Sequence, residues 1–152
     1  MSEPTFDVAA AHRWFAIESN NGAWDLIEQA DRTAADTDRM LHLAHASGWH
    51  WQQIGQPIQQ LRGLTLLATA YVAARVPSVA IRFGEQGLKL SHEIADAPPF
   101  DRACAHGAVA AAYQLAGRSA DATREYDTAY GIATKFDDAE DRAVFEKLYP
   151  RP

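Results

Sequence analysis

Apolar side chains recur every three to four residues along most of the chain, which is the period of a helix with one buried face. In the first segment this stripe comprises Phe6, Ala10, Trp14, Ile17, Asn21 and Trp24. The stripe keeps its phase through Asn20-Asn21-Gly22, although such a sequence on its own indicates a turn. We therefore predict one helix over about residues 4–30, with Asn21 on its buried face. A break at Asn20–Gly22 is the alternative.

Capping residues, glycines and prolines divide the rest of the chain into further helices. Thr33 followed by Asp36 resembles a capping box, with Asp in place of the usual Glu or Gln. The segment Asp96-Ala97-Pro98-Pro99 is the clearest break, but it is too short for a flexible linker between domains. The further helices are predicted at residues 33–54, 57–74, 77–94, 100–115, 119–135 and 138–148. Because the connections are short, neighbouring helices are expected to run antiparallel.

The amino-acid composition favours an all-helical fold. Alanine, the best helix former, makes up about a fifth of the chain, whereas β-branched residues are sparse. No segment shows the strict alternation of apolar and polar residues that a half-buried strand requires. The length of 152 residues suits one domain with a sizeable core. The predicted fold class is therefore all-α, in a single domain.

Charge, cysteine content and hydropathy exclude several classes of function. The 14 basic and 20 acidic residues give a net charge of −6, which argues against binding nucleic acid by neutralising phosphates. Cys104 is the only cysteine, so no disulfide forms within the chain. The longest apolar stretch, residues 61–74, falls short of the roughly 20 residues that cross a membrane. The acidic start Met1-Ser2-Glu3-Pro4 does not resemble a signal peptide, and we expect a cytoplasmic protein.

A self-similar pattern occurs in two of the predicted hairpins, offset by 42 residues. The two copies are Leu67-Ala68-x2-Tyr71 with Ala80, and Val109-Ala110-x2-Tyr113 with Ala122. They resemble the tetratricopeptide repeat (TPR), in which small residues let two helices approach closely and tyrosines fill the groove between them. The resemblance implies a right-handed array of antiparallel helical hairpins. Its units would be a divergent first hairpin (4–55), TPR-like hairpins (57–95 and 99–136) and a capping helix (138–148). A plain helical bundle is the alternative.

A second resemblance concerns the segment from His42 to Trp51. It reads His42-Leu43-Ala44-His45-Ala46-Ser47-Gly48-Trp49-His50-Trp51. This sequence is similar to the motif H-x-A-H-A-S-x-x-H-W, which is typical of an uncharacterised bacterial family of small TPR-like proteins. Gly55-Gln56-Pro57 and Arg62-Gly63 follow where that family has G-T-P and R-G-E-W, so Leu64 and Thr65 replace its Glu and Trp. The resemblance implies no assigned activity, and a site that needs this Glu would be incomplete here.

Histidine and tryptophan are concentrated near the start of the chain. All four tryptophans and four of the six histidines lie within the first 51 residues. His42 and His45 share one helix face, with His50 about 100° away. Neighbouring imidazoles bind transition metals, and the spacing has some resemblance to three-histidine metalloproteins of the DinB type. Those proteins need a further C-terminal His-x3-His pair, and no histidine follows His106. A small-molecule or metal-dependent enzyme using His42, His45 and His50 is therefore the alternative function.

The same cluster has two other interpretations. In the first, His42 and His45 form structural hydrogen bonds to the first helix, with Asn21 or Ser47 as partners. In the second, the cluster is a ligand-binding pocket with a few polar groups between aromatic walls. Its residues would be Asn21, Trp24, His42, His45, His50, Trp51 and Arg62. Arg62 would grip a carboxylate or phosphate there, or else pair with Glu28 or Asp31.

No P-loop, dinucleotide-binding, HExxH or GxSxG motif is present, so the sequence gives no support for an enzyme. The TPR resemblance implies instead a non-catalytic scaffold that binds a peptide or partner protein on its concave face, without a metal or cofactor. That face would include Thr65, Thr69, Gly107, Ala111 and Gln114. The small residues Gly107 and Ala111 would leave room for a ligand backbone. Formation of a homodimer is the rival use of this surface.

Overall fold

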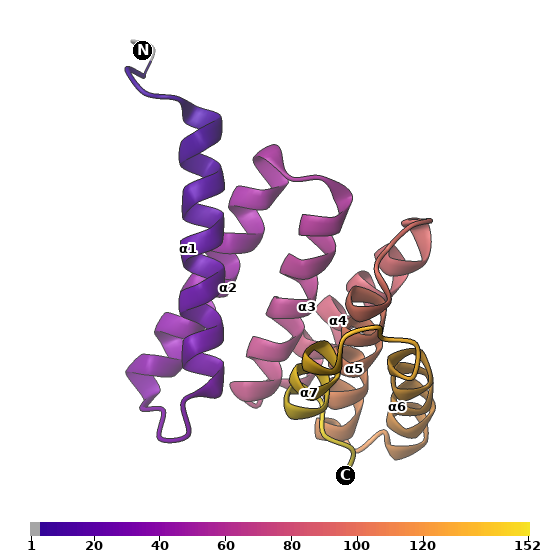
Figure 1. Cartoon of the computed structure of the whole chain (residues 1–152). Helices are drawn as coiled ribbons and strands as arrows, with labels where there is room; N and C mark the ends of the chain where they lie inside the picture. Colours follow the sequence, from indigo (N-terminus) through magenta and orange to yellow (C-terminus); the bar gives the residue numbers. More distant parts are fainter. Residues whose placement is uncertain (1–3) are drawn as a thin grey trace.

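The computed structural model describes residues 4–152, which form seven α-helices and no strand. The helices are α1 (Val8–Glu28), α2 (Ala34–Ile54), α3 (Pro57–Ala73), α4 (Pro77–Glu93), α5 (Pro99–Leu115), α6 (Ser119–Ala133) and α7 (Ala139–Leu148). Successive helices pack in pairs, so the predicted all-α array of helical hairpins is confirmed (Figure 1). The interpretation that the chain has no signal peptide rests on Met1–Glu3, which lie outside the described residues.

The helix starts follow from local sequence. In the predicted capping box, the Asp36 amide donates to Thr33 Oγ1 (3.1 Å) and the Thr33 amide donates to Asp36 Oδ2 (3.0 Å). Pro57, Pro77 and Pro99 each open a helix, where the missing N–H of proline has no intrahelical partner to lose. These signals explain why most predicted boundaries agree with the structure to within a residue or two. None of the helices in the described part is long and apolar enough to cross a membrane.

α1 is one continuous helix, as expected, but its buried face differs from the prediction. The buried residues are Ala16, Ser19, Ala23 and Leu26. Trp14 and Ile17 are instead 58% and 42% exposed, and Asn21 is exposed, so its predicted burial was wrong. Small side chains let α2 come so close that Ser47 Oγ donates a hydrogen bond to the Ala16 carbonyl (2.9 Å). Bulky residues do not fit a contact this tight, and they therefore face outward.

The alanines of the repeat mark close contacts between helices. Ala68, Ala80, Ala110 and Ala122 are all fully buried. Gly84 allows a similarly close contact between the two hairpins, since a Cβ at this position would lie only 3.1 Å from Val109 Cα. Small residues at these positions thus allow α4 to pack closely on α5.

The array has an inner face formed by the first helix of each hairpin. α3 packs against both α1 and α5, whereas α2, α4 and α6 make no comparable contact with one another within residues 4–152. First helices that lie closer together than second helices produce a curved array with α1, α3 and α5 on its inner side.

α7 does not extend this array as a cap at its end. It folds back over the inner face, where Figure 1 shows it in front of α5. Phe145 packs on Tyr130 of α6, and Lys147 forms an ion pair with Glu28 of α1 (2.5 Å). The last helix therefore contacts both ends of the array and forms one wall of a pocket.

Candidate binding pocket on the inner face

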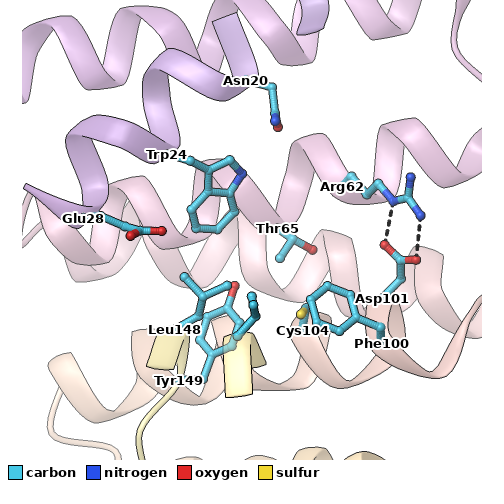
Figure 2. Close-up of a pocket in the computed structure, with 11 residues that line it drawn as sticks. Asn20, Trp24, Glu28, Arg62, Thr65, Phe100, Asp101, Cys104, Leu148 and Tyr149 are labelled. Atoms are coloured by element: carbon cyan, nitrogen blue, oxygen red, sulfur yellow. Dashed lines mark hydrogen bonds and ion pairs between the residues drawn. The ribbon is translucent and has the colours of Figure 1, made fainter. Parts of the chain in front are cut away.

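A pocket of about 350 Å³ opens on the inner face, between α1 and α7 (Figure 2). Its lining comes from α1, α3, α5 and residues 139–149, which comprise α7 and Tyr149 and are called the α7 segment below. The lining residues are Asn20, Trp24, Glu28, Arg62, Thr65, Phe100, Asp101, Cys104, Val144, Leu148 and Tyr149. Asn20, Trp24 and Glu28 are spaced four residues apart, which places them on one side of α1. Figure 2 shows the Trp24 indole facing Leu148 and Tyr149 across the pocket.

One edge of the pocket carries an ion pair between Arg62 of α3 and Asp101 of α5. Arg62 Nε and Nη2 donate to the two carboxylate oxygens of Asp101 at 2.7 and 3.0 Å. The Asp101 side chain is only 7% exposed, whereas that of Arg62 is 56% exposed. The hydrogen bond to Asp101 raises the pKa of Arg62 above its usual value. The alternative pairing of Arg62 with Glu28 or Asp31 is therefore not formed.

The opposite edge carries the ion pair between Glu28 and Lys147. Each charged side chain that lines the pocket is thus already paired with an opposite charge. Between these edges the walls are apolar, with Trp24, Phe100 and Leu148 among them. Burial raises the pKa of the Cys104 thiol, so this residue also presents a neutral surface. The pocket is suited to a neutral, apolar group.

Tyr149 fills the inner face next to the pocket. A Cβ at Gly107 would lie 2.7 Å from Tyr149 Cγ, so the ring packs where only glycine leaves room. The Thr69 hydroxyl donates to the Thr65 carbonyl (2.9 Å), and Thr69 Oγ1 lies 2.9 Å from the Tyr149 hydroxyl. Because Thr69 has a single hydroxyl proton, Tyr149 is the donor in this second bond. Burial raises the pKa of Tyr149, which keeps this donor protonated.

The five residues predicted for the concave face therefore have different surroundings. Thr65 lines the pocket, whereas Thr69 and Gly107 are covered by Tyr149 of the same chain. Ala111 is half-buried, Gln114 is exposed, and neither lines the pocket. The room that Gly107 was expected to leave for a ligand backbone is taken by Tyr149.

The predicted histidine cluster is dispersed. His45 Nε2 lies 2.9 Å from the Tyr71 hydroxyl on α3, and His50 Nδ1 lies 2.8 Å from His12 Nδ1 on α1. His42 is exposed. Burial, followed by the nearby charge of Arg82, lowers the pKa of His45, and burial also lowers that of His50.

Of the seven residues predicted for a ligand pocket, only Trp24 and Arg62 line this pocket on the inner face. Asn21 is exposed and accepts a hydrogen bond from the Asn20 side chain, and Trp51 is half-buried on α2. The predicted bonds from the histidines to Asn21 or Ser47 are not formed, because Ser47 binds the α1 backbone instead. Within residues 4–152, no three His, Cys, Asp or Glu side chains are grouped as a metal site requires.

The α7 segment supplies three of the pocket residues that were not predicted from the sequence, Val144, Leu148 and Tyr149. The others are Asn20, Glu28, Phe100, Asp101 and Cys104. Val144 and Leu148 are spaced as one row on this short helix, and Phe145 and Tyr149 form a second row. The two adjacent rows form one apolar face about 100° wide, which indicates a helix that packs on its neighbours along that face. That signal was present in the sequence, but it does not say which surface α7 packs against.

Comparisons of this chain with protein-family models, with curated proteins and with solved structures found no match. The resemblance to tetratricopeptide repeats remains a prediction from the sequence. The function of the protein must therefore be inferred from the geometry of the pocket.

Proposed function

We propose that this protein is a non-catalytic, TPR-like scaffold that binds a segment of a partner protein on its inner face. The observation that carries the proposal is the apolar pocket of about 350 Å³ between α1, α3, α5 and α7. Its volume lies in the lower part of the range of ligand-binding sites, which suits one apolar side chain and the backbone next to it. The proposal includes a cytoplasmic location and no cofactor.

The paired charges around the pocket indicate the chemistry of the bound segment. Arg62 is neutralised by Asp101 and Glu28 by Lys147, so neither edge offers a free charge to an ionic ligand. An aromatic or long aliphatic side chain would bury its surface against Trp24 and Leu148. The partner's backbone would then remain at the rim, close to Asn20 and to the unused N–H groups of Arg62.

The packing of α7 supports this mode of binding. The inner face already holds one helix of the same chain, with the Tyr149 ring over Gly107 and its hydroxyl on Thr69. Helices bound in grooves commonly use such apolar anchors, spaced three or four residues apart. A partner segment would lie beside α7 and insert its own anchor next to Trp24.

A binding role fits the pocket better than catalysis does. Cys104 is the one thiol of the chain, and its raised pKa keeps it in the unreactive neutral form. The three histidines of the alternative enzyme function lie outside the pocket, each in different surroundings.

The proposal is tested by selecting phage-displayed random peptides on the immobilised protein. Synthetic copies of the enriched peptides are then measured by fluorescence polarisation. The test variant is Val144→Arg, which places a cation in the pocket wall at an exposed position of α7. Ala143→Arg is the matched control, because Ala143 is the exposed neighbour of Val144 and does not line the pocket.

We expect the enriched peptides to share an aromatic or long aliphatic residue. Their affinity should fall at least about tenfold in Val144→Arg, as for an anchor in a central pocket, and stay unchanged in Ala143→Arg. Enrichment of no peptide, or equal binding to both variants, would overturn the proposal.

A further inference from the structure

The outer edge of α1 carries an apolar stripe that no other element of residues 4–152 covers. Trp14 and Ile17 are 58% and 42% exposed on this edge. Figure 1 shows α1 as the outermost helix of the array, with α2 behind it. Terminal helices of repeat arrays need a polar outer face to stay soluble alone. The exposed positions of α6, at the other end, include Thr123, Arg124, Asp127 and Thr128, so the array is polar at one end and apolar at the other.

The spacing of the stripe is that of a coiled-coil seam. Ala10, Trp14, Ile17 and Asn21 follow one another at intervals of four, three and four residues. This pattern places Ala10 and Ile17 at d positions of a heptad, and Trp14 and Asn21 at a positions. A single asparagine at an a position fixes the register of paired helices, because the two copies hydrogen-bond across the seam. Asn21 is exposed in the single chain and would take this role in such a pair.

Charges beside the seam select one relative orientation of the two helices. Arg13 occupies a g position and Glu18 the e position of the following heptad, which face each other across a parallel, in-register pair. Neither residue forms an ion pair within residues 4–152. In an antiparallel pair e positions face e positions and g positions face g positions instead, so Arg13 would not meet Glu18. Charge complementarity therefore favours the parallel arrangement.

We propose that α1 forms a homodimer with α1 of a second copy of this chain, through a parallel, in-register contact that extends from Ala10 to Asn21. Trp24, the next d position, faces the pocket instead (Figure 2). The residues that bind α1 to its own hairpin, such as Ala16 and Ala23, lie on the opposite side of the helix. The two hairpins therefore point away from each other and do not clash. The row of α1 that lines the pocket, Asn20, Trp24 and Glu28, lies beside this seam. The homodimer does not rest on the function proposed for the pocket.

The size of the contact sets its expected strength. Three turns of helix, from Ala10 to Asn21, extend about 16 Å at a rise of about 1.5 Å per residue. Such a contact is small beside the interfaces of obligate dimers, so we expect a dissociation constant in about the micromolar range. Dimer and monomer should then both be seen within the concentrations that sedimentation and light scattering cover.

The first test measures the mass of the full chain in solution against protein concentration. The wild type should pass from its monomer mass of 16.7 kDa toward twice that value. Ile17→Glu places a carboxylate in the seam and should keep the protein monomeric at every concentration. Phe15→Glu is the matched control, because Phe15 is also exposed (47%) but stacks on His50 at the other side of α1. The Phe15→Glu variant should dimerise like the wild type. Circular dichroism should show equal helix content in the wild type and in both variants.

The second test examines orientation and register. Arg13→Glu should weaken the dimer by about tenfold, since it turns two attractive pairs into repulsive ones. The double variant Arg13→Glu, Glu18→Arg should restore wild-type affinity. Asn21→Cys should form a disulfide between copies on mild oxidation, because a parallel register places position 21 opposite itself.

Three results would overturn the inference. A wild type that stays monomeric at about millimolar concentration shows that α1 does not pair. A dimer that persists in Ile17→Glu uses another surface. A dimer with no rescue by the double variant and no disulfide at position 21 has another orientation. Loss of peptide binding in Val144→Arg with an intact dimer would separate this contact from the pocket.

Discussion

Arg75 and Gly117 occupy equivalent positions in the hairpins α3–α4 and α5–α6, and both have a left-handed backbone, with φ of 60° and 76°. They follow the ends of α3 and α5, 42 residues apart. In each copy the next amide donates to a tyrosine carbonyl at 2.9 Å, from Val76 to Tyr71 and from Arg118 to Tyr113. The two turns therefore have the same hydrogen bonding, although only one of them has the glycine that this conformation favours.

Arg75→Gly is expected to stabilise the protein by about 0.5–1 kcal/mol, because glycine adopts a positive φ without steric cost. Gly117→Arg, at the equivalent position, should destabilise it by a similar amount. Urea unfolding followed by circular dichroism measures both. Effects of the same sign in the two variants would show that the turns are not equivalent.

Arg62→Ala is expected to destabilise the protein by about 2 kcal/mol, since it leaves the buried Asp101 carboxylate without its partner. This is less than for a fully buried pair, because Arg62 is half-exposed. Asp101→Asn removes the charge, so adding it to Arg62→Ala should recover part of the loss. Unfolding free energies of the two single variants and the double variant test this coupling, and purely additive values would contradict it.

Gly107→Ala is expected to displace Tyr149, whose ring lies 2.7 Å from the position of the new Cβ. The predicted result is faster hydrogen exchange and proteolysis in residues 139–149, at a cost of about 1–3 kcal/mol. Gly131→Ala is the control, because a Cβ on Gly131 of α6 meets nothing within 4 Å. That variant should gain up to about 1 kcal/mol from helix propensity. Unchanged exchange in the α7 segment of Gly107→Ala would contradict the packing of Tyr149.

Thr65 and Thr69 lie one turn apart on α3 and should respond oppositely to replacement by valine. Thr65 Oγ1 is buried without a hydrogen-bond partner, so Thr65→Val should be neutral or stabilising by about 1 kcal/mol. Thr69→Val removes the acceptor of the buried Tyr149 hydroxyl and should cost about 1–3 kcal/mol. Thermal unfolding of the two variants measures this difference. A greater loss of stability in Thr65→Val than in Thr69→Val would contradict the hydrogen bonding described for the two threonines.

Acid should weaken the fold through His45 and His50. Burial holds the pKa of each below the ordinary 6.5, so in mildly acidic solution the unfolded chain binds more protons than the folded one. Stability should therefore fall as the pH drops below about 6.5, and His45→Gln should reduce this dependence. Titration of the imidazole signals by nuclear magnetic resonance gives the midpoints directly. A midpoint for His45 above 6.5 would reverse the sign.

Much of the fold was predictable because its signals are local. Thr33 with Asp36, and the prolines that open α3, α4 and α5, fix helix starts through the chemistry of a single turn. The burial of Ala68 and Ala110 followed from a repeat that recurs in the sequence itself. The buried face of α1 was predicted wrongly because bulky apolar residues were taken to mark the core. Ala16 and Ala23 form that contact instead.

The pocket was only partly predictable because it depends on contacts between distant segments. Trp24 and Arg62 were expected near a ligand, and both line the pocket. Tyr149 meets Thr69 across 80 positions of sequence, and Lys147 meets Glu28 across 119. No local pattern specifies such pairs, because they depend on where the chain folds back after α6.

The return of α7 to α1 has a consequence for how the molecule unfolds. Arrays of helical hairpins in which each unit touches only its neighbours lose their ends one at a time. Here the ion pair between Lys147 and Glu28 joins the last helix to the first, while Tyr149 is held between α3 and α5. Unfolding of either end of the array therefore requires breaking contacts with the other end. We therefore expect the unfolding of the first and last helices to be coupled through this closed path of contacts.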